Sequence, residues 1–140
     1  MSNERPYTEA INRLRDANLR TTRQRLALCK LLFAEGDRHV TAESLHAEAT
    51  QAGVKVAVAT IYNTLRQFTE AGLLREVVVE NGKTYFDTNT SNHHHFYVED
   101  DGRLLDIDGA EVVVEGLPAA PHGTEVSRVD VVVRVSSASK

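Results

Sequence analysis

The stretch that decides the fold is residues 57–72, which read AVATIYNTLRQFTEAG. Ile61, Leu65 and Phe68 recur at i, i+4 and i+7, so they form one apolar stripe along a helix. A glycine follows at residue 72, where a left-handed residue commonly ends a helix. The side opposite the stripe carries small, hydrogen-bonding and cationic residues, namely Ala59, Tyr62, Asn63 and Arg66. The stretch therefore predicts a helix with one packed side and one side free to bind a partner.

A β-hairpin is predicted directly after this helix. Residues 74–79 and 84–86 have the composition of strands, and Asn81-Gly82 between them is a strong signal for a hairpin turn. A helix with a polar outer side followed by a hairpin is typical of a recognition helix and its wing. Side chains on such a helix contact base edges and phosphates of DNA. The alternative is an ordinary core helix beside a surface hairpin.

Three further helices are predicted before residue 57. Thr8, Thr22 and Thr41 are expected to cap them, because a threonine side chain accepts a hydrogen bond from the first turn of a helix. The second of these helices covers residues 23–33, and Gly53 closes the third. Three helices, a recognition helix and a hairpin follow one another in a winged helix-turn-helix domain.

The formal net charge is −4 at pH 7, and it is unevenly distributed. Residues 1–76 hold 11 Lys and Arg against 9 Asp and Glu, whereas residues 77–140 hold 5 against 11. Residues 11–30 alone hold 6 Lys and Arg against one Asp. A local basic stripe attracts phosphates within a Debye length of about 8–10 Å, whatever the total charge. This stripe favours nucleic-acid binding by the first half of the chain, and the alternative is a solvated helix face.

The single cysteine, Cys29, excludes an intrachain disulfide and any zinc site built from several cysteines. It shares one helix face with Leu26 and Phe33, so we expect a small core residue. No apolar run approaches the roughly 18 residues of a membrane span, and no signal-peptide core opens the chain, which predicts a cytoplasmic protein without membrane contact. The motifs of phosphate loops, nucleophile elbows and zinc hydrolases are missing from the sequence, which predicts that the protein is not an enzyme.

The second half of the chain predicts a smaller domain rich in strands. Residues 96–99 and 103–107 are expected to pair, and residues 109–123 to form a loop because they contain two prolines. The valine-rich residues 125–135 predict a buried strand. Three strands bury little apolar surface, so pairing with a second copy of the chain is expected. The predicted fold class is α+β: a winged-helix DNA-binding domain over 1–87, a hinge over 88–92 and a small α/β dimerisation domain over 93–140.

The densest chemical signal is the run His93-His94-His95. On an extended strand His93 and His95 point to one face and His94 to the other, so two imidazoles form a pincer for a divalent transition metal. Further ligands are expected from elsewhere in the chain: Asp87, Asp106 and His39. Such a mixed set suits Fe(II), Mn(II) or Zn(II). The alternatives are an exposed histidine run without function and a catalytic zinc site, for which no general base can be named.

Four motifs of this chain resemble the ferric uptake regulator family between about Tyr7 and Arg134: Arg20-Thr21-Thr22-Arg23-Gln24-Arg25, Ala59-Thr60-Ile61-Tyr62, Gly82-Lys83-Thr84-Tyr85-Phe86-Asp87 and His93-His94-His95. Within the family the chain is most similar to the iron response regulators of alphaproteobacteria. The resemblance implies a dimeric, metal-sensing transcription factor. It places a regulatory metal site that ties the two domains together on His39, Asp87, His93, His95 and Asp106. It also implies that His93, His94 and His95 bind haem, so that iron or haem status is the signal.

The DNA contacts are expected at the basic stripe and on the outer side of the 57–72 helix: Arg15, Arg20, Thr22, Arg23, Arg25, Ala59, Thr60, Tyr62, Asn63 and Arg66. The expected partner is a palindromic, A/T-rich operator in double-stranded DNA. Asn63 stands where the ferric uptake regulator itself has arginine, and asparagine pairs best with adenine, so a different operator is expected. The structural four-cysteine zinc site of many relatives is excluded by the single cysteine.

Two alternative functions stay open at this point. The peroxide sensors of the same family also use three histidines and two aspartates, and iron bound there oxidises its own histidine ligands. The five residues of this chain match that pattern equally well, so the ligand set does not separate iron or haem sensing from peroxide sensing. The alternative from another class is a protein that buffers metal or haem.

Overall fold

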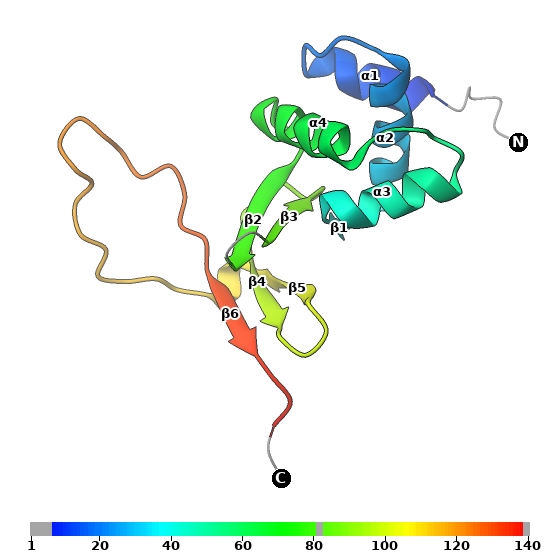
Figure 1. The fold of residues 1–140 in the computed structure, drawn as a ribbon. Coiled ribbons are helices and arrows are strands. Elements are labelled where there is room, and N and C mark those ends of the chain that lie inside the picture. Colours follow the sequence, from blue (N-terminus) through cyan, green and yellow to red (C-terminus); the bar gives the residue numbers. More distant parts are fainter. Residues whose placement is uncertain (1–6, 81–82, 139–140) are drawn as a thin grey trace, which may run out of the picture. The chain divides into compact units, whose positions relative to one another are not determined.

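The computed structural model describes residues 7–80 and 83–138. The chain divides into two compact units, an N-terminal unit that ends at Thr90 and a C-terminal unit that begins at Ser91. The predicted turn at Asn81-Gly82 lies outside the described residues. Within the described ranges, no helix is long and apolar enough to cross a membrane. Figure 1 shows the helices and strands of each unit.

The N-terminal unit contains four helices: α1 (Thr8–Asp16), α2 (Arg23–Phe33), α3 (Ala42–Gln51) and α4 (Val58–Glu70). The caps predicted for α2 and α3 are confirmed. The Thr22 hydroxyl accepts a hydrogen bond from the Arg25 amide at 3.2 Å, and Thr41 forms a reciprocal capping box with Ser44. The cap predicted for α1 is wrong, because Thr8 is already helical and Tyr7 before it makes no side-chain cap bond.

The last turn of α4 ends in a residue with a left-handed backbone, as predicted. Gly72 has φ +84°, a conformation that costs glycine little because it lacks a Cβ atom. The next amide, that of Leu73, donates to the Phe68 carbonyl at 2.9 Å and closes a Schellman motif. Gly53 after α3 has φ +79°, so the same geometry ends the helix before α4.

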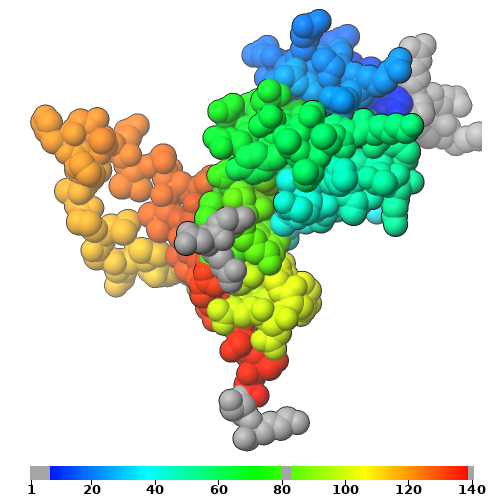
Figure 2. All heavy atoms as spheres, in the orientation of Figure 1, coloured from blue at the N-terminus to red at the C-terminus, as the bar shows by residue number. Residues whose placement is uncertain are grey.

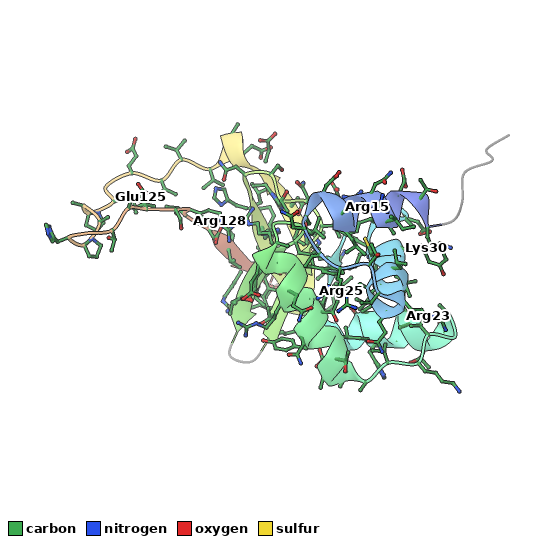
Figure 3. All side chains as sticks on the ribbon, turned by 90° about the horizontal axis from the view of Figure 1, so that it is seen from above. Arg15, Arg23, Arg25, Lys30, Glu125 and Arg128 are labelled. Carbon is green, nitrogen blue, oxygen red and sulfur yellow. The ribbon has the colours of Figure 1, made fainter. Side chains whose placement is uncertain are left out.

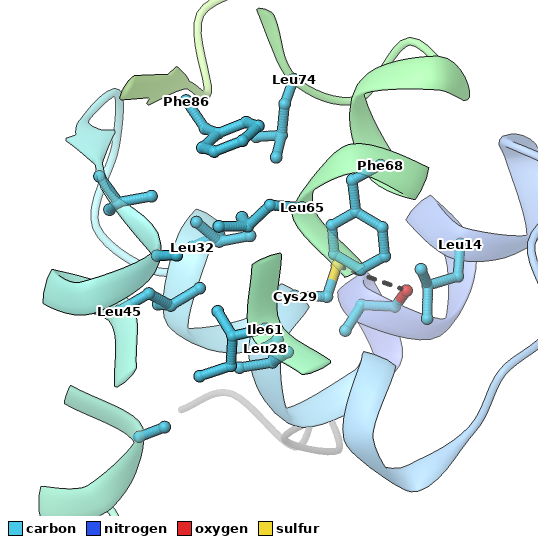
Figure 4. Close-up of a cluster of buried hydrophobic side chains, with 14 residues drawn as sticks. Leu14, Leu28, Cys29, Leu32, Leu45, Ile61, Leu65, Phe68, Leu74 and Phe86 are labelled. Carbon is cyan, nitrogen blue, oxygen red and sulfur yellow. Dashed lines mark hydrogen bonds between the residues drawn. The ribbon is translucent and has the colours of Figure 1, made fainter. Parts of the chain in front are cut away.

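The core of the N-terminal unit is formed by one buried face from each helix (Figure 4). Ile61, Leu65 and Phe68 of α4 are fully buried, which confirms the predicted apolar stripe. Cys29 of α2 is buried with them, and its thiol lies 4.0 Å from the carbonyl oxygen of Ala10 in α1. Burial raises the pKa of this thiol to about 11. Cys29 is therefore a small core residue, as predicted.

A three-stranded antiparallel sheet completes the N-terminal unit. It has the order β1-β3-β2, with β1 at His39–Val40, β2 at Arg75–Glu80 and β3 at Lys83–Asp87. The strands β2 and β3 are the predicted hairpin. Strand β1 was not predicted from the sequence, and it places His39 opposite Asp87 in the sheet.

The C-terminal unit is built on a second three-stranded sheet, of order β5-β4-β6. The strands β4 (His93–Val98) and β5 (Arg103–Asp108) form the predicted hairpin, and the single turn η1 (Gly109–Glu111) follows. The prediction of a buried strand over residues 125–135 is largely wrong. Only β6 (Val132–Val135) is a strand, parallel to β4, and none of its residues is buried.

The segment from residue 112 to residue 131 has neither helix nor strand. Figure 2 shows it in orange as an open loop whose two limbs are separated by space. Most of its side chains are exposed, Val113 and Val126 among them. Valine favours strands only where a neighbouring strand or layer covers it, and here the chain supplies neither over most of the segment.

Candidate DNA-facing helix and metal half-sites

Helix α4 presents the predicted polar side to solvent. Ala59, Tyr62, Asn63 and Arg66 are exposed, and Thr60 is half-buried. The Arg66 guanidinium lies 5.9 Å from the centre of the Tyr62 ring, within the range of a cation–π contact. The Tyr62 ring also meets Phe86 of β3 edge to face, with the ring centres 6.2 Å apart. The outer side of α4 is thus attached to the wing through one aromatic contact.

The basic stripe runs over α1, α2 and the residues between them, and Figure 3 labels Arg15, Arg23 and Arg25 there. Arg15, Arg20 and Arg23 are exposed and available to phosphates. Arg25 has a different position, because its guanidinium donates to Gln67 of α4 at 2.9 Å and to the Arg20 carbonyl at 3.1 Å. It therefore ties the start of α2 to α4. Thr22, also predicted to contact DNA, uses its hydroxyl as the cap of α2.

The N-terminal unit brings together two of the predicted metal ligands, His39 and Asp87, which we call the N-terminal pair. They are direct neighbours across β1 and β3, and His39 Nε2 lies 3.2 Å from Asp87 Oδ2. The other carboxylate oxygen of Asp87 accepts a hydrogen bond from the Asn89 amide at 2.9 Å. Arg75 of β2 is the neighbour of Asp87 on the opposite side and is buried, although the sequence analysis did not name it.

The C-terminal unit brings together the other three predicted ligands, His93, His95 and Asp106, which we call the C-terminal trio. Asp106 lies opposite His95 in the β4–β5 hairpin. Its Oδ1 atom is 3.5 Å from His93 Nε2 and 3.5 Å from His95 Nε2. The two imidazole rings stand 4.6 Å apart between centres, on one face of β4. The alternation expected for an extended strand accounts for this placement.

The hydrogen bonding of His93 suits a metal ligand. Its Nδ1 lies 2.7 Å from the Ser91 carbonyl oxygen, which can only accept, so Nδ1 carries the proton. In the neutral ring, Nε2 then presents a lone pair toward Asp106, as metal-bound histidines held by a backbone carbonyl do. A lone pair and a carboxylate oxygen that face each other at 3.5 Å can act as two ligands of one cation. The imidazole and carboxylate donors of the trio fit Fe(II), Mn(II) or Zn(II).

His94 lies on the face of β4 opposite to His93 and His95. It is buried, and its Nδ1 accepts a hydrogen bond from the Val131 amide at 3.1 Å. This bond attaches the residue before β6 to the central strand. The three histidines predicted to bind haem are thus divided between two faces, and only two of them converge.

Sequence reasoning also missed two residues that flank the N-terminal pair, Arg38 and Thr88. The Arg38 guanidinium pairs with Glu48 of α3 through both of its terminal nitrogens. Its hydrogen bonds with Glu48 raise the pKa of Arg38. The signal that could have found Arg38 is its position directly before a predicted ligand, His39.

The chain is similar to known proteins in sequence and in fold. Residues 16–134 match the model of the family described as the Ferric uptake regulator family. The peroxide-responsive repressor PerR of Staphylococcus aureus is 35% identical over 103 residues, which are 74% of this chain and 69% of that protein.

Two solved structures extend the likeness to the fold. The ferric uptake regulator of Pseudomonas aeruginosa with manganese is 26% identical, with a TM-score of 0.69 over 91% of this chain and 97% of that chain. The Vibrio cholerae ferric uptake regulator is 25% identical, with a TM-score of 0.71 over 90% of this chain and 98% of that chain. These likenesses confirm the predicted fold class, an N-terminal helix-turn-helix domain followed by a small α/β domain.

Proposed function

This chain belongs to the ferric uptake regulator family, and we propose on that basis that it regulates transcription in response to iron status through one divalent metal ion. Proteins of this family are dimeric, metal-responsive, DNA-binding regulators and not enzymes. The finer likeness to the iron response regulators comes from the sequence motifs. It is part of the proposal, as is the ligand set.

The observation that carries the proposal is the convergence of the C-terminal trio. Two imidazole Nε2 atoms lie 3.5 Å from one carboxylate oxygen, Asp106 Oδ1. The ligand atoms of the trio all lie within 4.8 Å of one another, which is the spacing of donors around a single ion. A histidine run on an exposed strand without function has no reason to be buried against a carboxylate in this way.

We further propose that the N-terminal pair completes the coordination of the same ion. The trio offers three ligands and the pair two, whereas the candidate metals take about four to six. When bound by residues of both units, the ion supplies a fixed link between them. His39 and Asp87 belong to the sheet that carries the wing, so their capture selects one orientation of α4 relative to the dimerisation unit.

That orientation decides DNA binding in a dimer. Two recognition helices reach successive major grooves only when their separation matches one turn of the duplex. Tyr62, Asn63 and Arg66 are the residues we assign to base edges and phosphates, and Arg15, Arg20 and Arg23 to phosphates. An A/T-rich palindrome is the proposed operator, because Asn63 pairs best with adenine.

The signal has two candidates. Iron status follows from the sequence motifs, and haem is its less favoured form because His94 faces away from His93 and His95. Peroxide is the second candidate, favoured by the 35% identity to a peroxide-responsive repressor. Its donor set of three histidines and two aspartates would be the same. Iron-loaded protein treated with peroxide separates the two: a gain of one oxygen on His39 or His93 in the mass spectrum supports peroxide sensing, and unmodified histidines support iron sensing.

The ligand assignment is tested on the full chain with Mn(II), which does not oxidise its ligands. We expect wild-type protein to change its affinity for an A/T-rich palindrome when Mn(II) is added. His39→Ala and His95→Ala should each lower the affinity for Mn(II) by more than the roughly 10–100-fold seen for outer-shell changes, and should remove the effect of Mn(II) on DNA binding.

His122→Ala is the matched control, because His122 is exposed in the segment without helix or strand and belongs to neither half-site. It should behave as wild type. Equal Mn(II) affinity for wild type, His39→Ala and His95→Ala would reject the ligand assignment. An affinity for the palindrome no greater than that for random DNA would favour a metal-buffering protein instead. A haem titration of His93→Ala tests the haem form of the signal.

A further inference from the structure

The residues next to the N-terminal pair form a second layer of contacts around it. Arg38 directly precedes His39, and Thr88 directly follows Asp87. The Arg38 amide donates to the Thr88 hydroxyl at 2.9 Å, and the Thr88 amide donates to the Arg38 carbonyl at 3.0 Å. These bonds continue the ladder between β1 and β3 by one more residue on each side. They fix the backbone from which both ligands project.

The side chain of Arg38 extends this ladder to the helices. One terminal nitrogen donates to Glu48 Oε1 at 2.9 Å and to the Leu31 carbonyl at 3.2 Å, and the other pairs with Glu48 Oε2. Leu31 lies in the last turn of α2 and Glu48 near the end of α3. A bidentate pair between arginine and a carboxylate holds both partners in one orientation. A single side chain therefore joins the ligand strand to two helices.

The strand β1 needs such an anchor because it has only two residues, His39 and Val40. Its register with β3 rests on the pairs His39–Asp87 and Val40–Phe86. A strand of this length has little stability of its own, so its position depends on what holds its ends. Arg38 is the residue that enters β1, and its guanidinium is half-buried against the helices.

We propose that Arg38 is a positioning residue, which holds His39 and Asp87 ready for the metal ion and couples their position to helix α3 through Glu48. This inference rests on the proposed function, since it takes His39 and Asp87 as metal ligands. It adds a route by which capture of the ion reaches the helix-turn-helix itself. Displacement of His39 moves the Arg38 backbone, and the guanidinium transmits that movement to Glu48.

The first test uses the metal-free full chain, so it does not depend on metal binding. Hydrogen–deuterium exchange is measured over residues 38–40 and 86–88 in wild type, Arg38→Gln and Arg38→Lys. We expect exchange to be about tenfold faster in Arg38→Gln, since the ladder loses its anchor. Arg38→Lys keeps the positive charge but loses the two parallel donors of the guanidinium. Its exchange rate should fall between those of wild type and Arg38→Gln. Unchanged exchange in both variants would overturn the proposal.

The second test measures Mn(II) affinity and the ratio of operator affinities with and without Mn(II). Arg38→Gln and Glu48→Gln should each weaken Mn(II) binding by about tenfold, the lower end of outer-shell effects. The double variant should bind Mn(II) no more weakly than the weaker of the two single variants, because all three variants break the same connection between Arg38 and Glu48. Fully additive losses, or wild-type values in all three, would contradict coupling through this pair.

Two further variants, Arg103→Gln and His39→Ala, distinguish a failure of this inference from a failure of the proposed function. Arg103→Gln breaks another arginine–carboxylate pair, with Asp101 in the β4–β5 turn, and should leave both measurements unchanged. Thermal unfolding of each variant identifies a general loss of stability. If His39→Ala abolishes the response to Mn(II) while the Arg38 and Glu48 variants behave as wild type, the proposed function stands and this inference fails. If His39→Ala also has no effect, the proposed function has failed.

Discussion

At the scale of single residues, burial decides the chemistry of Cys29. Its thiol is fully buried in the helical core and lies near the Ala10 carbonyl (Figure 4). The raised pKa, about 11, keeps it protonated at physiological pH. Because the thiolate is the form that binds metals and reacts with oxidants, we expect this residue to take no part in the proposed sensing. The proposed site accordingly uses imidazoles and carboxylates.

The pKa of Cys29 predicts how stability changes in alkali. The unfolded thiol loses its proton near its ordinary pKa of 9.0, whereas the folded thiol does so only near 11. Above pH 9 deprotonation therefore stabilises the unfolded state relative to the folded state. The free energy of unfolding should fall between pH 9 and pH 11. Cys29→Ala should lose this component. Urea unfolding of both proteins across this pH range is the measurement, and parallel curves would contradict the prediction.

The candidate ligands could be predicted where the chain places them by local rules. Asp106 was predicted as a candidate ligand on the strand that follows the histidines. In the structure the turn at residues 100–102 sets a register that puts Asp106 opposite His95. Arg38 could not be predicted in the same way. Its role depends on the pairing of β1 with β3 across about fifty residues of sequence, and no periodicity records such a pairing.

At the scale of elements, α4 has a buried side that packs in the core and an exposed side that we assign to DNA. Ile61, Leu65 and Phe68 are fully buried, and Tyr62 and Arg66 are exposed. The helix is fixed to its neighbours by the apolar side and by the hydrogen bond from Arg25 to Gln67. Substitutions on the buried side should therefore lower the stability of the fold, whereas substitutions on the exposed side should weaken DNA binding.

Replacing Tyr62 and Arg66 together by alanine should abolish operator binding and leave the fold intact. Both side chains are on the outer side of α4, so their loss should lower the free energy of unfolding by only about 0.5–1.5 kcal/mol, through the lost contact between Tyr62 and Phe86. Leu65→Ala is the matched change on the inner side and should destabilise the protein by about 2–5 kcal/mol. Gel shifts and urea unfolding measure the two effects. Wild-type operator binding by the double variant would reject the assignment of α4 as the recognition helix.

The elements that sequence predicted well are those with local signals. The helices α2 and α3 begin at threonine caps, and α4 ends at a left-handed glycine. Each of these signals involves only a few consecutive residues at one end of its helix. The strand β1 was missed because two residues carry no period. The expected strand over 125–135 was overestimated, because valine content reports strand propensity and does not report what covers the strand.

At the scale of the whole molecule, the C-terminal unit exposes a row of apolar side chains that its own chain does not cover. Phe96 of β4 lies directly between Leu105 of β5 and Val133 of β6 in the register of the sheet. Their exposed fractions are 37%, 43% and 37%. An apolar row across three strands is typical of a surface that pairs with a second copy. The C-terminal trio lies on the other face of this sheet, so we expect dimerisation and metal binding to use different faces of one element.

The dimer should therefore dissociate when a charge is placed in the middle of this row. Phe96→Glu puts a carboxylate where two copies would exclude water, and such a burial without a partner is strongly unfavourable. Sedimentation velocity should show a monomer, whereas Val78→Glu, an equally drastic change at an exposed valine of β2, should remain a dimer. Operator affinity should fall by at least about 100-fold in Phe96→Glu, because a monomer binds one half-site and loses the effective concentration of the second. A Phe96→Glu protein that sediments as a dimer would show that the two copies meet at another surface, and the apolar row would then need a different partner.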